Sequence, residues 1–285
     1  MEASSEESPG GGGMIIDAHA HLRDGQGDVS VFIAAMDENG IDKACVSNLV
    51  RNALQKPDEI NRYIFDAVQR YPDRLIGFAC ILPQLANAAN LLELYVREYG
   101  MKGLKLHPPI QDFSPADPSI FPVVEKAIEL DIPILFHTGP IFVERARLKY
   151  SDPVFIDELA LAFPKAKIIL GHGDPLGYGP VVAGKHANVY MDTCIVFARV
   201  ARLIPGIAEE TLEWMDIGRQ SNRPGSGGFD PLGGADKLMF GTDAVQLHTH
   251  RFKYNLEPIQ RMKIPEAAKA KILGGNIAKL LKLNV

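Results

Sequence analysis

The stretch MIIDAHAHLRDG, residues 14–25, joins a short apolar run to two histidines, His19 and His21, which stand two positions apart. Alternate side chains of a β-strand point to the same face, so Asp17 would share one face of a strand with both histidines. Three ionisable groups on a buried face are costly unless a partner such as a metal ion compensates for them. Histidine pairs are also common in surface loops, so the rest of the sequence decides between the two interpretations.

Seven more apolar runs of strand length follow along the chain. They are KACVSNL (43–49), LIGFACIL (75–82), GLKLH (103–107), PILFH (133–137), KIILGH (167–172), NVYMDT (188–193) and KLMFGTD (237–243). Amphipathic stretches of helical length lie between them, and two open with Asp-Pro, at Asp117 and Asp152, which is typical of a helix start. Eight strand–helix units predict an α/β fold, a single-domain (β/α)8 TIM barrel. An open doubly wound sheet is less favoured, because no glycine-rich phosphate-binding turn follows the first strand.

The composition limits the possible classes of function. The net charge of -5 does not favour a nucleic-acid partner, and no apolar run reaches the length of a membrane span. The three cysteines are widely spaced and form no CxxC pair, which indicates a reducing compartment. Residues 1–13 are acidic, serine-rich and end in glycines, without the apolar core of a signal peptide. We therefore predict a flexible tail over 1–13, one domain over 14–285 and a cytoplasmic protein.

Polar residues gather at the carboxyl ends of the predicted strands. These residues are His19, His21, His107, His137, His172, Asp192 and Asp243. The carboxyl ends of barrel strands meet at one mouth, which is where TIM-barrel enzymes carry out catalysis. Three imidazoles and a carboxylate suit Zn²⁺ or a similar ion, which lowers the pKa of a bound water. This placement, more than the histidine pair itself, predicts a metal site.

The motifs DAHAH, GLKLHP, FHTG, GHGD and FGTDA, in this order, resemble those of the amidohydrolase superfamily. The chain is similar to the branch that contains aminocarboxymuconate-semialdehyde decarboxylase and many metal-dependent hydrolases, and the resemblance covers almost the whole chain. It implies that the metal ligands are His19, His21, His137 and Asp243. It further implies that His172 holds the catalytic water or binds a second metal, and that Asp243 also handles protons.

Two features of the mouth leave alternatives open. Lys105 stands where two-metal members of the superfamily carry a carboxylated, bridging lysine, but it could equally bind a substrate carboxylate as an ammonium group. We expect one Zn²⁺, and a second ion only if Lys105 is carboxylated. Asp174 follows His172 where relatives often have a second glycine, and it either contacts substrate or caps the following helix. Five cations follow strands on the mouth side and would indicate a carboxylate substrate if they point inward: Arg51, Arg145, Arg147, Lys149 and Arg251.

The sequence favours a metal-dependent hydrolase that uses a metal-activated water on a C–N or C–O bond of a small amide, lactone or ester. Asp243, His172 and Lys105 would be its catalytic residues. The alternative is a metal-dependent lyase, a decarboxylase or hydratase of a small unsaturated or aromatic carboxylic acid. The compact chain favours hydrolysis, because decarboxylases of the branch tend to be longer. A small-molecule substrate is expected, with no nucleic-acid or membrane partner, and the resemblance implies a homodimer.

Overall fold

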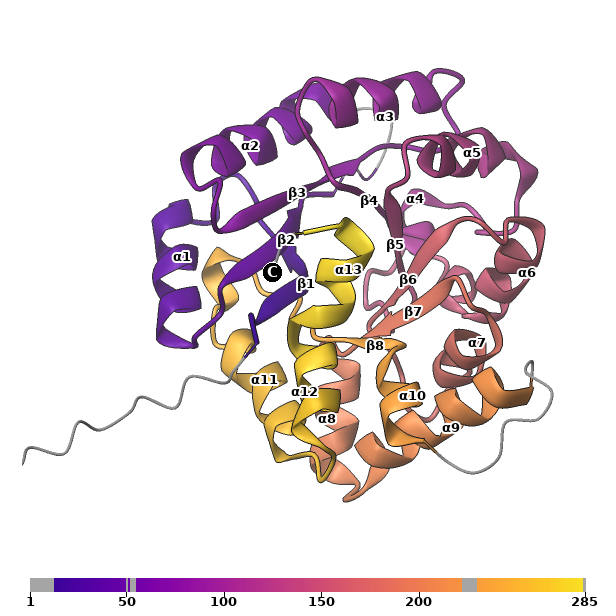
Figure 1. Cartoon of the computed structure of the whole chain (residues 1–285). Helices are drawn as coiled ribbons and strands as arrows, with labels where there is room; N and C mark the ends of the chain where they lie inside the picture. The colour runs from indigo at the N-terminus through magenta and orange to yellow at the C-terminus, as the bar shows by residue number, and fades with distance from the viewer. Residues whose placement is uncertain (1–12, 50, 52–54, 222–229, 284–285) are drawn as a thin grey trace, which may run out of the picture.

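The structure, a computed structural model, describes residues 13–49, 51, 55–221 and 230–283. The predicted tail, 1–13, lies outside these residues except for Gly13, which is exposed. Eight parallel strands form one sheet in the order β1 to β8 (Figure 1). They are β1 (Ile16–His21), β2 (Lys43–Ser47), β3 (Leu75–Cys80), β4 (Gly103–Leu106), β5 (Pro133–His137), β6 (Lys167–Gly171), β7 (Val189–Asp192) and β8 (Leu238–Met239). Backbone hydrogen bonds from β1 to residues 240 and 244 join the last strand to the first, so the predicted TIM barrel is confirmed.

Helices surround the ring of strands, as Figure 1 shows. They are α1 (Val29–Glu38), α2 (Pro57–Arg70), α3 (Ala88–Arg97), α4 (Pro108–Gln111), α5 (Phe121–Glu129), α6 (Val154–Ala162), α7 (Gly179–Lys185), α8 (Val196–Leu203), α9 (Ile207–Ser221), α10 (Pro231–Ala235), α11 (Arg251–Arg261), α12 (Glu266–Ala270) and α13 (Asn276–Leu281). Both Asp-Pro starts are confirmed. The Asp117 carboxylate accepts from the backbone N–H of Ser119 at 2.8 Å, and Asp152 accepts from that of Val154 at 3.0 Å.

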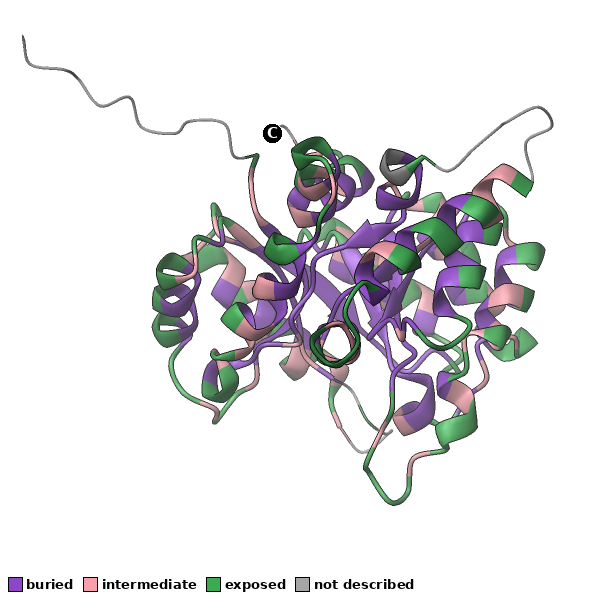
Figure 2. Cartoon of the chain, turned by 90° about the horizontal axis from the view of Figure 1, so that it is seen from below, coloured by how far each residue is buried: buried purple, intermediate pink, exposed green. Residues whose placement is uncertain are grey.

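The two larger apolar clusters hold the barrel together. The larger cluster lies between the strands and the helices, and the strands themselves are almost wholly buried (Figure 2). The smaller cluster fills the barrel with inward-facing strand residues such as Phe78, Leu135 and Ile169, and it includes Ile277 and Leu280 of α13. Helix α13 therefore closes the amino-terminal end of the barrel, and the polar strand ends gather at the other end.

A β-bulge in β1 changes which side chains face the barrel interior. The pairing of β1 with β2 shifts between Asp17 and Ala20. Ile16 belongs to the interior cluster, whereas Ala20 and Leu22 belong to the outer one, so the facing of side chains changes at the bulge. The prediction that Asp17 shares a face with His19 and His21 is therefore wrong, because an extra residue interrupts the strict alternation.

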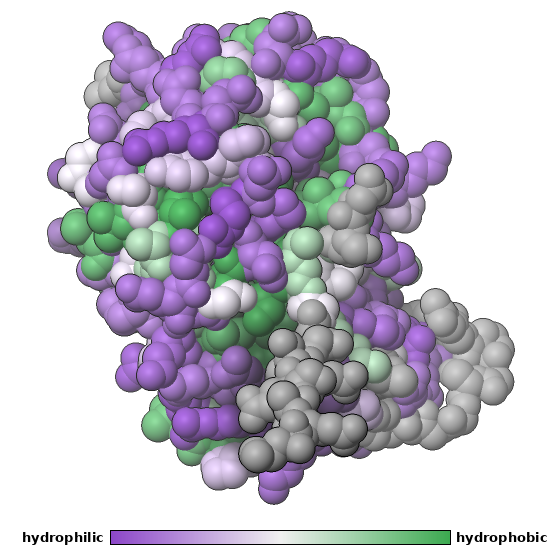
Figure 3. All heavy atoms as spheres, turned by 60° about the vertical axis from the view of Figure 1, so that its left-hand side comes forward, coloured by the Kyte–Doolittle hydropathy of each residue, from purple (hydrophilic) through white to green (hydrophobic). Residues whose placement is uncertain are grey.

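The surface on one side of the barrel is mostly polar (Figure 3). On the side that Figure 3 shows, hydrophilic residues predominate, and apolar residues lie between them in small groups. Among the described residues, no helix combines the length and the apolar character that crossing a membrane requires.

Gly274 lies in a π-helical turn, Lys271–Gly275, that packs directly on the start of β1. A Cβ at Gly274 would lie 2.0 Å from the carbonyl oxygen of Met14, whereas one at Gly275 would meet nothing closer than 3.4 Å. Because backbone must move to admit the methyl group, we expect Gly274→Ala to lower the free energy of unfolding by about 1–3 kcal/mol. Urea denaturation measures this, with Gly275→Ala as the matched control. Equal stability of the two variants would contradict the close approach.

Candidate metal centre

Five histidines meet at the carboxyl end of the barrel. They lie on two strands, β1 and β5, and directly after two others, β4 and β6. The ring of His19 lies 5.1 Å from that of His21 and 4.9 Å from that of His172, centroid to centroid. His137 continues the row, 4.5 Å from His172 and stacked on His107 at 3.9 Å. All five side chains are buried, so the predicted convergence of these residues on one mouth is present in the structure.

Asp243 points its carboxylate into this row of imidazoles. Its Oδ1 atom lies 3.1 Å from Nε2 of His21, 4.0 Å from Nε2 of His19 and 3.9 Å from Nε2 of His172. These separations lie around the roughly 3.4 Å expected between ligands of a tetrahedral ion with bonds of about 2.1 Å. His19, His172 and Asp243 each offer a ligand atom within 4.8 Å of the others. The donor set and its spacing therefore fit a divalent metal ion.

The protonation states also suit a metal site. Burial lowers the pKa of each imidazole, to about 3 for His172 and to about 2 for His107. Burial alone would raise the pKa of Asp243, but the hydrogen bond with His21 and the nearby imidazoles hold it well below its usual range. Near neutral pH the mouth therefore offers neutral imidazoles and an ionised carboxylate, which are the forms that bind a metal.

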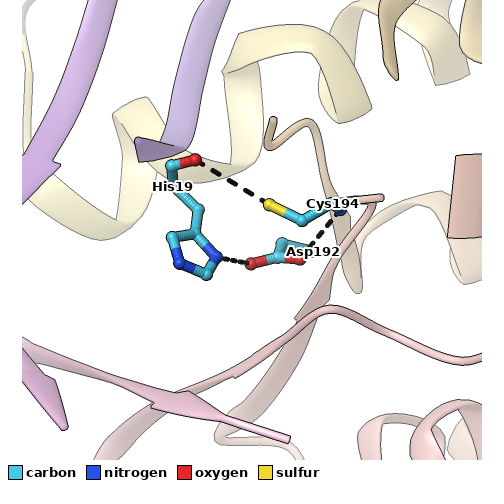
Figure 4. Close-up of side chains that lie close together, drawn as sticks. All are labelled: His19, Asp192 and Cys194. Atoms are coloured by element: carbon cyan, nitrogen blue, oxygen red, sulfur yellow. Dashed lines mark hydrogen bonds and ion pairs between the residues drawn. The ribbon is translucent and has the colours of Figure 1, made fainter. Parts of the chain in front are cut away.

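Asp192 fixes the tautomer of His19. Its Oδ2 atom lies 2.7 Å from Nδ1 of His19, so the imidazole donates its Nδ1 proton to this carboxylate (Figure 4). The lone pair of His19 then stands on Nε2, which faces the mouth. The buried amino group of Lys105 lies 2.9 Å from that Nε2 atom. The amino group of Lys105 thus lies beside the atom of His19 that would bind a metal.

The group of His19, Asp192 and Cys194 in Figure 4 is a support for the site and not a second metal centre. The other oxygen of Asp192 accepts the backbone N–H groups of His172 at 2.8 Å and Cys194 at 3.0 Å. Burial raises the pKa of the Cys194 thiol well above its usual value, which keeps it protonated. A carboxylate engaged with three donors and a neutral thiol make a poor ligand pair, whereas this carboxylate orients His19 as is usual beside metal-binding histidines.

The side chain of Asp17 forms hydrogen bonds with two backbone N–H groups and one hydroxyl. Its carboxylate accepts from the hydroxyl of Thr242 at 2.5 Å, from the N–H of Thr242 at 3.1 Å and from the N–H of His19 at 2.9 Å. Burial raises the pKa of Asp17 to about 8. Asp192, and not Asp17, therefore holds the imidazole of His19.

Two residues at the site have a backbone conformation that is rare for side chains other than glycine. His172 has φ 62° and Asp243 has φ 52°. Asp192 holds the N–H of His172, and the backbone N–H of Asp243 donates to the carbonyl of His19 at 2.7 Å. Strained residues that neighbours hold in place are typical of functional sites, and these two are among the predicted catalytic residues.

Other contacts at the mouth were not found by sequence reasoning. Arg251 donates to Oδ2 of Asp243 and to its carbonyl oxygen, both at 2.6 Å. The Ser47 hydroxyl lies 3.0 Å from Nδ1 of His21. Arg251 had been named only as one of five mouth-side cations, and the other four are exposed. Asp174 accepts from the N–H of Leu176 at 3.0 Å in the turn before α7. The cap residue of α7 is Tyr178, so Asp174 does not cap the following helix.

The structure places His137 beside the tight group of ligand atoms and not within it. Its Nε2 atom lies 3.1 Å from the carbonyl oxygen of Gly139. Burial lowers the pKa of the Lys105 amino group and so favours its uncharged form. This does not decide between an ammonium group that binds substrate and a carboxylated bridge. The ligand assignment to His19, His21, His137 and Asp243, and the catalytic assignment to Asp243, His172 and Lys105, stay predictions.

Fold and site together define a TIM barrel with a histidine- and aspartate-lined mouth that fits a metal ion. The family model described as Amidohydrolase matches residues 16–283, and the chain belongs to this family. The resemblance predicted from the motifs is confirmed.

Solved structures with the same fold add named relatives. A dihydroxybenzoic acid decarboxylase from Polaromonas sp. JS666, with bound manganese and 2-nitroresorcinol, is 19% identical with a TM-score of 0.67, over 96% of this chain and 98% of that one. A 5-carboxyvanillate decarboxylase from Novosphingobium aromaticivorans DSM 12444, also with manganese, is 17% identical with a TM-score of 0.65, over 95% and 98%. 4-Oxalomesaconate hydratase from Rhodopseudomonas palustris is 19% identical with a TM-score of 0.65, over 94% and 96%.

The expectation of a hydrolase is wrong by these comparisons. The relatives named above are two decarboxylases and a hydratase, which are lyases, and they agree with the alternative. Chain length does not separate the two chemistries, because the match spans 98% of each decarboxylase chain.

Proposed function

We propose that this protein is a metal-dependent lyase that decarboxylates a small aromatic or unsaturated carboxylic acid. The observation that carries the proposal is the ionised Asp243 carboxylate, which faces three imidazoles on one side and the Arg251 guanidinium on the other. The likeness to two decarboxylases that hold manganese and nitro-substituted phenols supports the proposal. When bound at this centre, a divalent ion would polarise a substrate oxygen.

The chain's own residues supply positioning and proton transfer. In decarboxylation, the bond between the carboxylate carbon and its neighbour breaks, CO₂ leaves, and the electron pair stays on the carbon that remains. That carbon then takes a proton. This proton enters from water. We assign its transfer to Asp243, which takes it up and passes it to the carbon, with His172 3.9 Å away as the group that shares the proton. Lys105, buried beside His19, contributes positive charge where the substrate anion enters.

Hydration of an unsaturated acid is the second candidate, and the likeness to 4-oxalomesaconate hydratase favours it. It uses the same mouth, with a water molecule added across a double bond. The identity of the metal ion needs the same kind of test, because the ligand set suits Zn²⁺, whereas two of the relatives hold manganese.

The experiment that tests this proposal loads the purified protein separately with Zn²⁺ and Mn²⁺ and incubates it with hydroxybenzoates and unsaturated dicarboxylic acids. We expect metal-dependent CO₂ release from at least one acid, abolished by chelation and restored by the ion, with about one ion per chain. Loss of the ultraviolet absorbance of an unsaturated acid without CO₂ would indicate hydration instead. Neither reaction with any acid, in protein shown to hold its ion, would contradict the proposal.

A further inference from the structure

The turn that follows β1 contains buried polar atoms that lack partners. Among the described residues, the buried side-chain nitrogen and oxygen atoms without a hydrogen-bond partner are Nε of Arg23 and Oε1 of Gln26, three residues apart. No carboxylate of the described part of the chain forms an ion pair with Arg23. Buried polar groups are nearly always hydrogen-bonded, so a buried arginine nitrogen without a partner indicates a possible binding site for a ligand.

The main chain of Arg23 is nevertheless firmly held. Its N–H donates to Oε1 of Gln246 at 3.1 Å, and its carbonyl accepts from Nε2 of Gln246, also at 3.1 Å. The same Nε2 atom lies 3.0 Å from the hydroxyl of Tyr63 on α2. Two residues distant in sequence thus fix the backbone from which the Arg23 side chain extends, and the fixation does not involve the guanidinium.

The charged groups that act on Arg23 come from the residues at the mouth of the barrel. Its half-buried guanidinium interacts electrostatically with Asp243 and with two further arginines, Arg51 and Arg251. The charge of Arg23 also acts on His21. Arg251 already pairs with Asp243 at 2.6 Å and Arg51 is exposed, so Arg23 is a positive group near a carboxylate that has its own partner. The excess positive charge favours an anionic substrate group beside Arg23.

We propose that Arg23 binds a carboxylate of the substrate that remains in the product, so that the substrate is a dicarboxylic acid. This proposal rests on the proposed decarboxylation. The carboxylate that leaves as CO₂ loses its charge as the bond breaks. An arginine on that carboxylate would stabilise the bound acid more than the transition state and so slow the reaction. An arginine on a second carboxylate gives binding and orientation without this penalty, because its charge does not change.

Binding measurements test the role of Arg23 without any turnover. Calorimetry on Mn²⁺-loaded protein compares isophthalate with 3-carbamoylbenzoate, which has a neutral amide in place of the second carboxylate. We expect the wild-type protein to bind isophthalate about 10- to 100-fold more tightly, and Arg23→Gln to reduce this ratio to near one while leaving the affinity for the amide unchanged. Arg97→Gln, at an exposed position on α3, is the matched control and should keep the full ratio.

Arg23→Lys keeps the charge and is the second variant, expected to retain part of the preference. Both variants should fold, because the contacts of Gln246 and Tyr63 are made to the main chain; thermal denaturation and metal content check this. An undiminished ratio in Arg23→Gln, or no preference in the wild type, would overturn the assignment. A preference that depends on Arg23 in a protein that releases no CO₂ would uphold the carboxylate site and contradict the decarboxylase, so the two proposals fail separately.

Discussion

Asp243→Asn is expected to lower the rate of CO₂ release by about 10²- to 10⁴-fold. The carboxylate is the negative partner of the three imidazoles that lie 3.1–4.0 Å from its Oδ1 atom, and its Oδ2 atom pairs with Arg251. Asparagine keeps the shape but loses the charge that binds an ion and the site that holds a proton. The metal content after dialysis, measured by elemental mass spectrometry, should fall from about one ion per chain to near zero.

The two assigned roles of Asp243 are separable in the same variant. A variant that keeps its ion but loses the rate would assign proton transfer to Asp243 and leave binding to the histidines. Asp236→Asn is the matched control, because Asp236 is partly exposed and pairs with Lys271 away from the mouth. Full activity and full metal content in Asp243→Asn would exclude Asp243 from the centre altogether.

Much of this architecture is predictable because it depends on local sequence. Buried parallel strands read as continuous apolar runs, and each of the eight predicted runs contains an observed strand. A histidine at the end of such a run, such as His137 in PILFH, must then lie at the mouth, since all parallel strands of a barrel end on the same side. The gathering of histidines therefore follows from strand boundaries alone.

The remaining features depend on contacts that no local pattern encodes. The bond between His19 and Asp192 joins residues 173 positions apart, and that between Arg23 and Gln246 joins residues 223 apart. The bulge in β1 arises from pairing with β2, so strict alternation misplaced Asp17. The motifs also could not predict the reaction class, because the same ligand set on one fold supports hydrolysis and decarboxylation.

Asp192→Asn is expected to weaken metal affinity by about 10- to 100-fold, although Asp192 is not placed as a ligand. The aspartate accepts three hydrogen bonds, from Nδ1 of His19 and from the N–H groups of His172 and Cys194. Asparagine has one oxygen and one N–H₂ group in place of the two carboxylate oxygens. The N–H₂ group must therefore face either the His19 imidazole or the backbone N–H groups, and all of these are hydrogen-bond donors. If the amide nitrogen faces His19, the imidazole is driven to place its proton on Nε2, the atom that faces the mouth. If it faces the backbone, the strained turn at His172 loses its support.

Competition with a fluorescent zinc chelator measures the affinity, and nuclear magnetic resonance of ¹⁵N-labelled histidine reports the tautomer of His19. The structure requires the two readouts to move together: an Nδ1-protonated ring in the wild type, and a change of tautomer or a displaced His172 in the variant that binds metal weakly. Asp37→Asn, at an exposed position on α1, is the control for the loss of one negative charge. Unchanged affinity in Asp192→Asn would mean that His19 needs no orienting carboxylate. The burial of Asp192 beneath the row of imidazoles would then serve the stability of the barrel and not its chemistry.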